Sequence, residues 1–256
     1  MTTGMEFKSK LKAELWRRFG HKDYPSEWDG NLLGGGKLSQ RFWEYFQAIE
    51  LLDLSRESVL LDIGGGSPVT GAGFFAATLA PHIKQVHILD VSIDQTRPAD
   101  KNIVYHRQLA TYDSICALLR AHPEITHAAS ISVFEHIEES VRLGIIKGVN
   151  DAFAGDVFVA TLEYHTKECF FEYQLTARTL SRLFEPFTNF YLETMAKAPV
   201  HAESAYTTGL RTYDFKQHTW MWRIGWCLRL FGLYKPTRNV QVPTWYPLAL
   251  KFARAS

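Results

Sequence analysis

The sequence predicts an α/β fold: a doubly wound, mostly parallel seven-stranded sheet with helices on both faces. Residues 59–63 form an apolar run that leads through three consecutive glycines into an apolar stretch at 71–79. This is the order of a strand, a tight turn and a helix. Strand-like and helix-like segments then alternate as far as residue 162, which is typical of parallel strands joined by helices. Two later strand-like segments complete the sheet as an antiparallel pair.

Two helices are expected before the first strand. In residues 6–19, Phe7, Leu11 and Leu15 recur every four positions and mark one helical face. In residues 40–54, apolar side chains again fall at helical spacing. A glycine-rich loop at 20–36 joins these two segments.

The alternating part of the chain gives the other elements. The expected parallel strands are 59–63, 85–90, 103–106, 127–133 and 156–162. The helices expected between and after them are 71–79, 112–121, 137–153 and 170–184. The expected final antiparallel strands are 187–195 and 245–253.

These elements suggest four parts. They are an N-terminal helical cap at 1–57, an α/β core at 58–195, a cap insertion at 196–242 and the final strand of the core at 243–256. A connection as long as 196–242 is more typical of a functional segment than of a bare loop. Its Trp-rich stretch, 219–234, either packs on the sheet and lines a substrate pocket or lies at a membrane surface as an interfacial helix.

Composition excludes several classes of protein. The 256 residues carry a formal net charge of +1, whereas nucleic-acid-binding domains are usually clearly basic. The three cysteines lie far apart and offer neither a disulfide framework nor metal spacing. The N-terminus has no secretory signal, and no apolar run reaches the roughly 18 residues of a membrane span. We therefore expect a cytoplasmic protein without a transmembrane segment, and leave peripheral membrane contact open.

The glycine turn follows the run Val-Leu-Leu-Asp-Ile at 59–63. It departs from the dinucleotide fingerprint Gly-x-Gly-x-x-Gly, because Val69 stands where the third glycine is required. It fits instead the pattern acidic residue-x-Gly-x-Gly, with Asp62, Gly64 and Gly66. A turn without side chains allows a ligand to approach the backbone closely.

Three further motifs follow in order. Asp90 ends the second strand, Ser-Val-Phe-Glu-His-Ile at 132–137 ends the fourth, and Ala-Gly-Asp-Val at 154–157 precedes the fifth. In combination with the glycine turn, they resemble the class I S-adenosylmethionine-dependent methyltransferases over residues 58–195. The resemblance implies a Rossmann-like methyltransferase fold and S-adenosyl-L-methionine as the cofactor.

The resemblance also implies roles for single residues. The backbone of Gly64, Gly65 and Gly66 would contact the methionine part of the cofactor, and Asp62 would hold its ammonium group. Asp90 would accept both ribose hydroxyls, since a carboxylate can take several hydrogen bonds.

Further cofactor contacts would come from two strand ends. Val91 follows Asp90, and Ser132, Phe134 and Glu135 follow the fourth strand, whose end the resemblance implies would lie beside the sulfonium.

Methyl transfer to a hydroxyl needs a base to take the proton. His136 and His165 follow the fourth and fifth strands and are the candidate catalytic bases, because an imidazole titrates near neutral pH. His201, in the expected cap, is a weaker candidate. No group of Asp, Glu and His residues has ligand spacing, so the sequence predicts no metal.

The expected function is methylation of a hydroxyl on a small molecule or glycan. Oxygen versus nitrogen as the acceptor atom and the oligomeric state stay open. The alternatives are a nicotinamide-dependent dehydrogenase, which Val69 opposes, and a catalytically inactive methyltransferase-fold binding protein. The second alternative rests on Pro68 in the glycine turn and on the absence of an acidic residue in Arg-Gln-Leu-Ala at 107–110.

Overall fold

A computed structural model describes residues 4–19, 37–67, 71–94, 101–165, 175–197 and 245–255. In this part of the chain, seven strands form one sheet in the order β5-β4-β1-β6-β7-β9-β8. The strands are β1 (Val59–Ile63), β4 (Gln85–Leu89), β5 (Ile103–His106), β6 (His127–Ile131), β7 (Val157–His165), β8 (Phe190–Lys197) and β9 (Trp245–Arg254). The first five are parallel, and β9 runs antiparallel to both of its neighbours, β7 and β8. The predicted fold class is confirmed.

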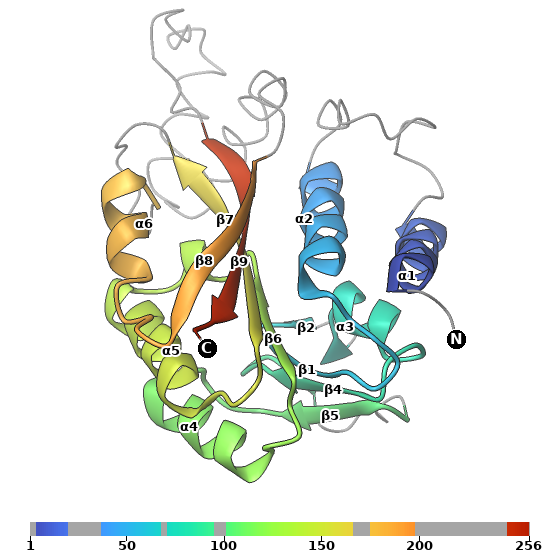
Figure 1. The fold of residues 1–256 in the computed structure, drawn as a ribbon, viewed down its shortest axis with the longest axis horizontal. Helices are drawn as coiled ribbons and strands as arrows, with labels where there is room; N and C mark the ends of the chain where they lie inside the picture. The colour runs from blue at the N-terminus through green and yellow to red at the C-terminus, as the bar shows by residue number, and fades with distance from the viewer. Residues whose placement is uncertain are drawn as a thin grey trace, which may run out of the picture.

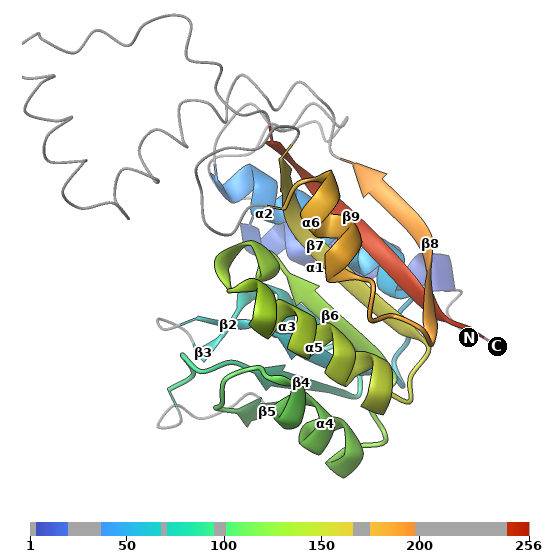
Figure 2. The ribbon, with the colours of Figure 1, turned by 90° about the vertical axis from the view of Figure 1, so that its left-hand side faces the viewer.

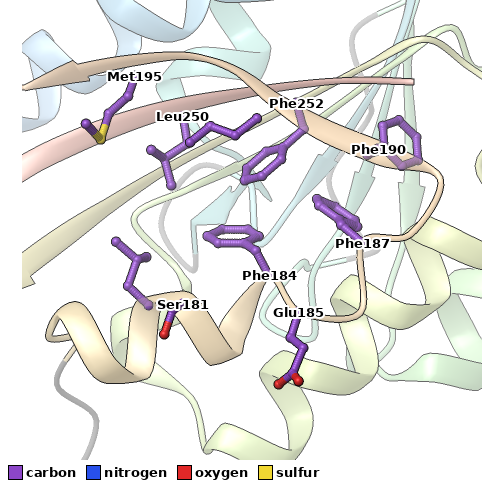
Figure 3. Close-up of a pocket in the computed structure, with 10 residues that line it drawn as sticks. Ser181, Phe184, Glu185, Phe187, Phe190, Met195, Leu250 and Phe252 are labelled. Carbon is purple, nitrogen blue, oxygen red and sulfur yellow. The ribbon is translucent and has the colours of Figure 1, made fainter. Parts of the chain in front are cut away.

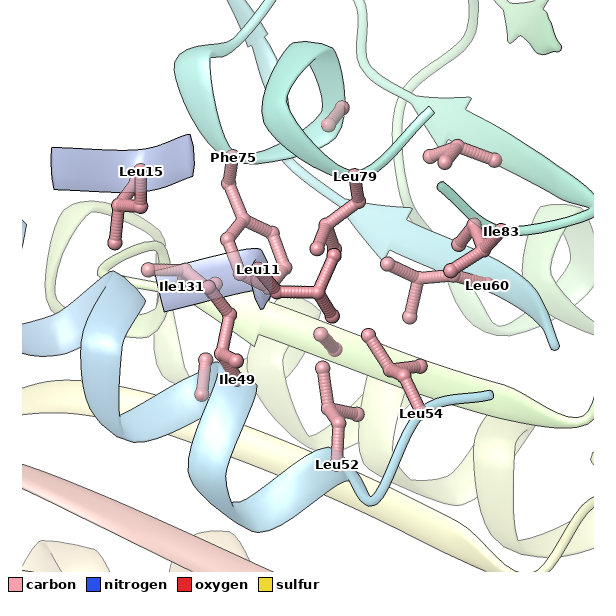
Figure 4. Close-up of a cluster of buried hydrophobic side chains, with 14 of the residues drawn as sticks. Leu11, Leu15, Ile49, Leu52, Leu54, Leu60, Phe75, Leu79, Ile83 and Ile131 are labelled. Carbon is pink, nitrogen blue, oxygen red and sulfur yellow. The ribbon is translucent and has the colours of Figure 1, made fainter. Parts of the chain in front are cut away.

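Helices cover both faces of the sheet (Figure 1). One face carries α1 (Gly4–Phe19), α2 (Lys37–Leu52) and α3 (Phe74–Leu79), and the other carries α4 (Tyr112–Ala121), α5 (Glu139–Ala152) and α6 (Ala177–Leu183). Figure 4 shows how the first layer packs: Leu11 of α1, Ile49 of α2 and Phe75 of α3 belong to one buried apolar cluster over the sheet. The two N-terminal helices thus form part of a helical layer on the sheet.

Local sequence explains the central elements. All five residues of β1 are buried, as expected for a continuous apolar run at the centre of a parallel sheet. Helix α4 begins where Thr111 and Ser114 form a reciprocal capping box. Strands β1 and β5 have the predicted bounds, and the other strands differ from the prediction by a few residues at their ends.

Three expected helices are shorter in the structure, and one of them is α6, which begins only at Ala177 and ends at Leu183. Residues 71–72 form β3, which pairs with β2 (Gly66–Ser67) in a small antiparallel hairpin, so α3 begins only at Phe74. The fourth strand is followed by a short 3₁₀ turn, η2 (Phe134–His136), before α5 begins at Glu139. The glycine-rich loop at 20–36, residues 170–174 and nearly all of the expected cap insertion lie outside the described residues.

The strand order has a switch point at the carboxyl end of β1. Chain connections lead from β1 to β4 and β5 on one side, and then return to β6 and β7 on the other side. In open α/β sheets, ligands bind where the strand order reverses in this way. Gly64 and Asp90 directly follow β1 and β4 at this switch point, and Ser132 directly follows β6.

Candidate functional site

The glycine turn is built so tightly that side chains are excluded from it. Gly64 donates its N–H to the carbonyl of Leu89 over 2.8 Å and has a φ of +75°, a conformation that L side chains rarely adopt. A Cβ on Gly64 would lie 2.5 Å from Cγ2 of Val133, which follows β6. The turn therefore contacts the end of β6 directly.

Gly65 lies on top of the Asp62 side chain. A Cβ at Gly65 would lie 2.1 Å from Oδ2 of Asp62, and Gly73 donates its N–H to the carbonyl of Gly65 over 2.7 Å. Gly66 donates its N–H to Oδ2 of Asp90 over 3.0 Å. The turn thus brings both carboxylates that the sequence singles out to one backbone segment.

Asp62 is a buried carboxylate without a hydrogen-bond partner for either oxygen in the part of the chain that the structure describes. Burial raises its pKa to about 7, and the negative charge of Asp90 adds to this effect. A buried unpaired carboxylate is costly, so a site of this kind favours a ligand that brings a positive charge.

Asp90 is already engaged with the protein. Its Oδ1 accepts hydrogen bonds from the N–H and the hydroxyl of Ser92, each over 2.7 Å, in addition to the Gly66 N–H on Oδ2. A carboxylate has about four acceptor positions, so one is left for a ligand hydroxyl and a second becomes free if the Ser92 hydroxyl turns away. Val91 follows on the surface, and Ile93 contacts the position of Gly66 from within the core.

The segment after β6 is strained and carries a buried acid. Ser132 has a φ of +53°, unusual for a residue other than glycine, and its N–H donates to the carbonyl of Thr161 over 2.9 Å. Its hydroxyl donates to Oε1 of Glu135. The other oxygen of Glu135 has no hydrogen-bond partner among the described residues, and burial raises the pKa of Glu135.

Phe134 occupies the opposite layer. Its side chain is completely buried and meets Phe184 edge to face, with ring centroids 6.3 Å apart. Phe134 therefore offers only its backbone to a ligand at the glycine turn.

The two candidate bases differ in their surroundings. The side chain of His136 is 46% exposed, and its Nε2 lies 4.0 Å from Oε1 of Glu135. His165 is the last residue of β7 and is buried, and burial lowers its pKa to about 4. At neutral pH His165 is therefore a neutral and only weakly basic imidazole.

The sequence analysis gave no role to Arg41, which lies next to the end of β6 in the structure. Arg41 of α2 donates from Nη1 to the carbonyl of Ile131 over 3.2 Å, and the same nitrogen lies 3.2 Å from Oε2 of the buried Glu44. Its charge also acts on Glu135. The sequence signal for this ion pair was an arginine and a glutamate three residues apart in an apolar helix.

Solved structures match this fold along nearly the whole chain. The [4+2]-cyclase SpnF is 12% identical, with a TM-score of 0.53 over 98% of this chain and 94% of its own. The cyclopropane synthase MmaA2 of Mycobacterium tuberculosis is 11% identical, with a TM-score of 0.52 over 95% and 93%. A geranyl diphosphate C-methyltransferase of Streptomyces coelicolor, solved with S-adenosyl-L-homocysteine, is 10% identical, with a TM-score of 0.51 over 96% and 98%. The fold is that of the class I methyltransferases.

No protein-family model matches the chain, and no curated protein matches it significantly. The similarity to the methyltransferases is therefore one of fold. Among the described residues of this methyltransferase fold, no helix is both long and apolar enough to cross a bilayer.

The methyltransferase fold also has an apolar hollow of about 390 Å³ that is separate from the glycine turn. It lies between α6 and the strands β8 and β9, where Phe184, Phe187 and Phe252 line it (Figure 3). In the sheet, β7 and β9 separate β8 from β6. This hollow thus lies apart from the switch point at β1.

Proposed function

We propose that the chain is an S-adenosylmethionine-dependent methyltransferase acting on a hydroxyl of a small molecule or glycan. One observation carries this proposal: the buried, unpartnered carboxylate of Asp62 lies directly under Gly65, at the carboxyl end of β1. In a methyltransferase fold, the negative charge of Asp62 at this position would pair with the ammonium group of a nucleoside cofactor. The neighbour solved with S-adenosyl-L-homocysteine supports the choice of ligand.

The residues present fit the cofactor. Asp62 would hold the ammonium group of its methionine part, since its two oxygens have no other partner among the described residues. The backbone of Gly64, Gly65 and Gly66 packs so closely against its neighbours that no side chain fits on it, so the turn would present only backbone to the cofactor. Asp90 would accept a ribose hydroxyl at its remaining acceptor positions.

Four further residues would border the cofactor. Val91 would flank it beyond β4, and Ser132 and Glu135 would form the wall after β6 together with the backbone of Phe134. The strained backbone at Ser132 is typical of a residue held in place at a site.

When bound, the cofactor supplies a methyl group already activated on a sulfonium. The protein then has to align an acceptor oxygen, exclude water and take one proton. His136 is the better placed of the two candidate bases, because its side chain is partly exposed after β6. His165 would serve better to orient an acceptor through hydrogen bonds, because burial makes it a weak base.

Calorimetric titration of the purified chain with S-adenosylhomocysteine and, separately, with NAD tests the choice of cofactor. We expect one S-adenosylhomocysteine per chain and no heat of binding from NAD. If S-adenosylhomocysteine does not bind at concentrations of tens of micromolar, the proposal is contradicted. Binding without methylation of any hydroxyl acceptor would favour the inactive binding protein instead, or a different reaction on the same fold.

Cofactor affinity is expected to depend on pH through Asp62. Because burial raises the pKa of this carboxyl to about 7, it is largely protonated at pH 6 and largely ionised at pH 8. Since only the ionised form pairs with an ammonium, S-adenosylhomocysteine should bind about tenfold more tightly at pH 8 than at pH 6 and release a proton on binding. Titrations in buffers of different ionisation enthalpy measure both effects. Equal affinity at the two pH values would show that Asp62 does not hold the ligand.

A further inference from the structure

Three histidines meet on the face of the sheet that α4 covers. His87 lies in β4, His106 ends β5, and His122 directly follows α4. One nitrogen from each imidazole lies within 4.8 Å of the corresponding nitrogens of the other two. Figure 2 shows α4 beside β4 and β5, the arrangement that brings these distant positions together.

The histidine cluster is separate from the glycine turn. Along β4, Val86 and Ile88 belong to the core under α1–α3, whereas Leu89 belongs to the core under α4–α6. Because side chains alternate along a strand, His87 points to the α4 side. Among the described residues, this is also the only group of three possible ligands of this kind.

Hydrogen bonds to two oxygen acceptors fix the tautomers of His87 and His122, and these tautomers suit metal ligands. Nε2 of His87 lies 3.1 Å from the side-chain oxygen of Gln85, and Nδ1 of His122 lies 3.0 Å from Oε1 of Glu124. Both oxygens can only accept, so these two nitrogens carry the hydrogens. The opposite nitrogens, Nδ1 of His87 and Nε2 of His122, then carry lone pairs. A histidine that ligates a metal typically has an oxygen partner of this kind.

The geometry points to a binding site for one divalent transition-metal ion, which we propose to be Zn²⁺, held by His87, His106 and His122. Three imidazole nitrogens with one position open to water are a ligand set that zinc accepts, at Zn–N distances of about 2.0–2.1 Å. Nδ1 of His87 accepts a hydrogen bond from Nε2 of His106 over 3.0 Å, and one nitrogen of His122 lies within 4.8 Å of this pair. On binding an ion, His106 would change tautomer, with its proton moving to Nδ1, and the rings would rotate to bring the three nitrogens to one ion. The nearby Glu124 would offset part of the charge of the ion.

In this site zinc would clamp β4, β5 and the end of α4 to one another.

Zinc titration of the chelator-treated, full-length chain tests the site. We expect one Zn²⁺ per chain with a dissociation constant below about 10 μM, a higher melting temperature with zinc, and visible ligand-field bands when Co²⁺ replaces zinc. The double variant His106→Asn/His122→Asn should lose all three signals. The matched control His82→Asn, which alters a histidine outside the cluster, should keep them.

A second variant tests the site even if the double variant does not fold. Glu124→Gln keeps all three ligands and removes only the outer carboxylate, so zinc affinity should fall about tenfold. The proposal is overturned if the wild type binds no zinc tighter than about 10 μM, or if the folded double variant binds it equally well. Titration with S-adenosylhomocysteine should give the same affinity for all these variants, which keeps this test independent of the proposed function.

Discussion

Asp62→Asn should weaken S-adenosylhomocysteine binding by more than about thirtyfold and yet stabilise the free protein at pH 8. The variant loses the charge that would pair with the ammonium group, and charge-assisted hydrogen bonds of this kind contribute about 1.5–3 kcal/mol. In the free protein, the pKa of Asp62 is raised from 3.8 to about 7. Ionisation of Asp62 therefore opposes folding. Through this group, the free energy of unfolding falls as the pH rises from about 4 through 7.

Thermal melts at pH 5 and pH 8, together with calorimetry, check both halves of this prediction. The melting temperature of the wild type should fall more between pH 5 and pH 8 than that of Asp62→Asn. Asp156→Asn, which removes an exposed carboxylate before β7, is the matched control and should leave binding unchanged. Wild-type affinity in Asp62→Asn would exclude this carboxylate from the cofactor site.

Gly65→Ala should abolish cofactor binding and destabilise the fold by about 1–3 kcal/mol, the usual range for overpacking. The new methyl group would lie 2.1 Å from Oδ2 and 2.2 Å from Cγ of Asp62, so the carboxylate or the turn would have to move. The turn has little room to do so, because the carbonyl of Gly65 also accepts the N–H of Gly73.

Gly144→Ala gives the comparison for this substitution. Gly144 lies inside α5, and an added Cβ would lie 3.4 Å from the nearest atom, the backbone nitrogen of Tyr112. Alanine favours a helix interior over glycine by up to about 1 kcal/mol, so this variant should be as stable as the wild type or more stable. Chemical denaturation and calorimetry of both variants distinguish a local effect at the turn from a general effect of adding a methyl group. Full cofactor binding by Gly65→Ala would refute the proposed close approach of ligand to backbone.

The sequence predicts the sheet well because its strands are short apolar runs bounded by polar or turn residues. It fails at 71–79, where the apolar spacing indicates one helix. In the structure, Gly73 approaches the carbonyl of Gly65 so closely that the chain first forms a hairpin with residues 66–67. Helical periodicity carries no information about such a contact between turn residues.

The candidate site, too, is only partly predictable from the sequence. The motif locates Asp62 and Asp90, but only the packing shows that Asp62 has no partner among the described residues while Asp90 has three donors. The histidine cluster illustrates the opposite case. The separation of its members along the chain matches no metal-ligand spacing, and the sequence therefore predicts no metal, whereas the strand–helix crossover brings these residues together.

The position of β9 has a consequence for biosynthesis. This strand pairs on one side with β7 and on the other with β8, although residues 245–254 come last among the described elements. Once residues 59–165 have left the ribosome, the five parallel strands are available. Among the described strands, however, β8 pairs only with β9 and has to wait for it. Closure of that half of the sheet must therefore wait for the end of translation of this segment, and a nascent chain stalled before residue 245 would expose the free edge of β7 to chaperones.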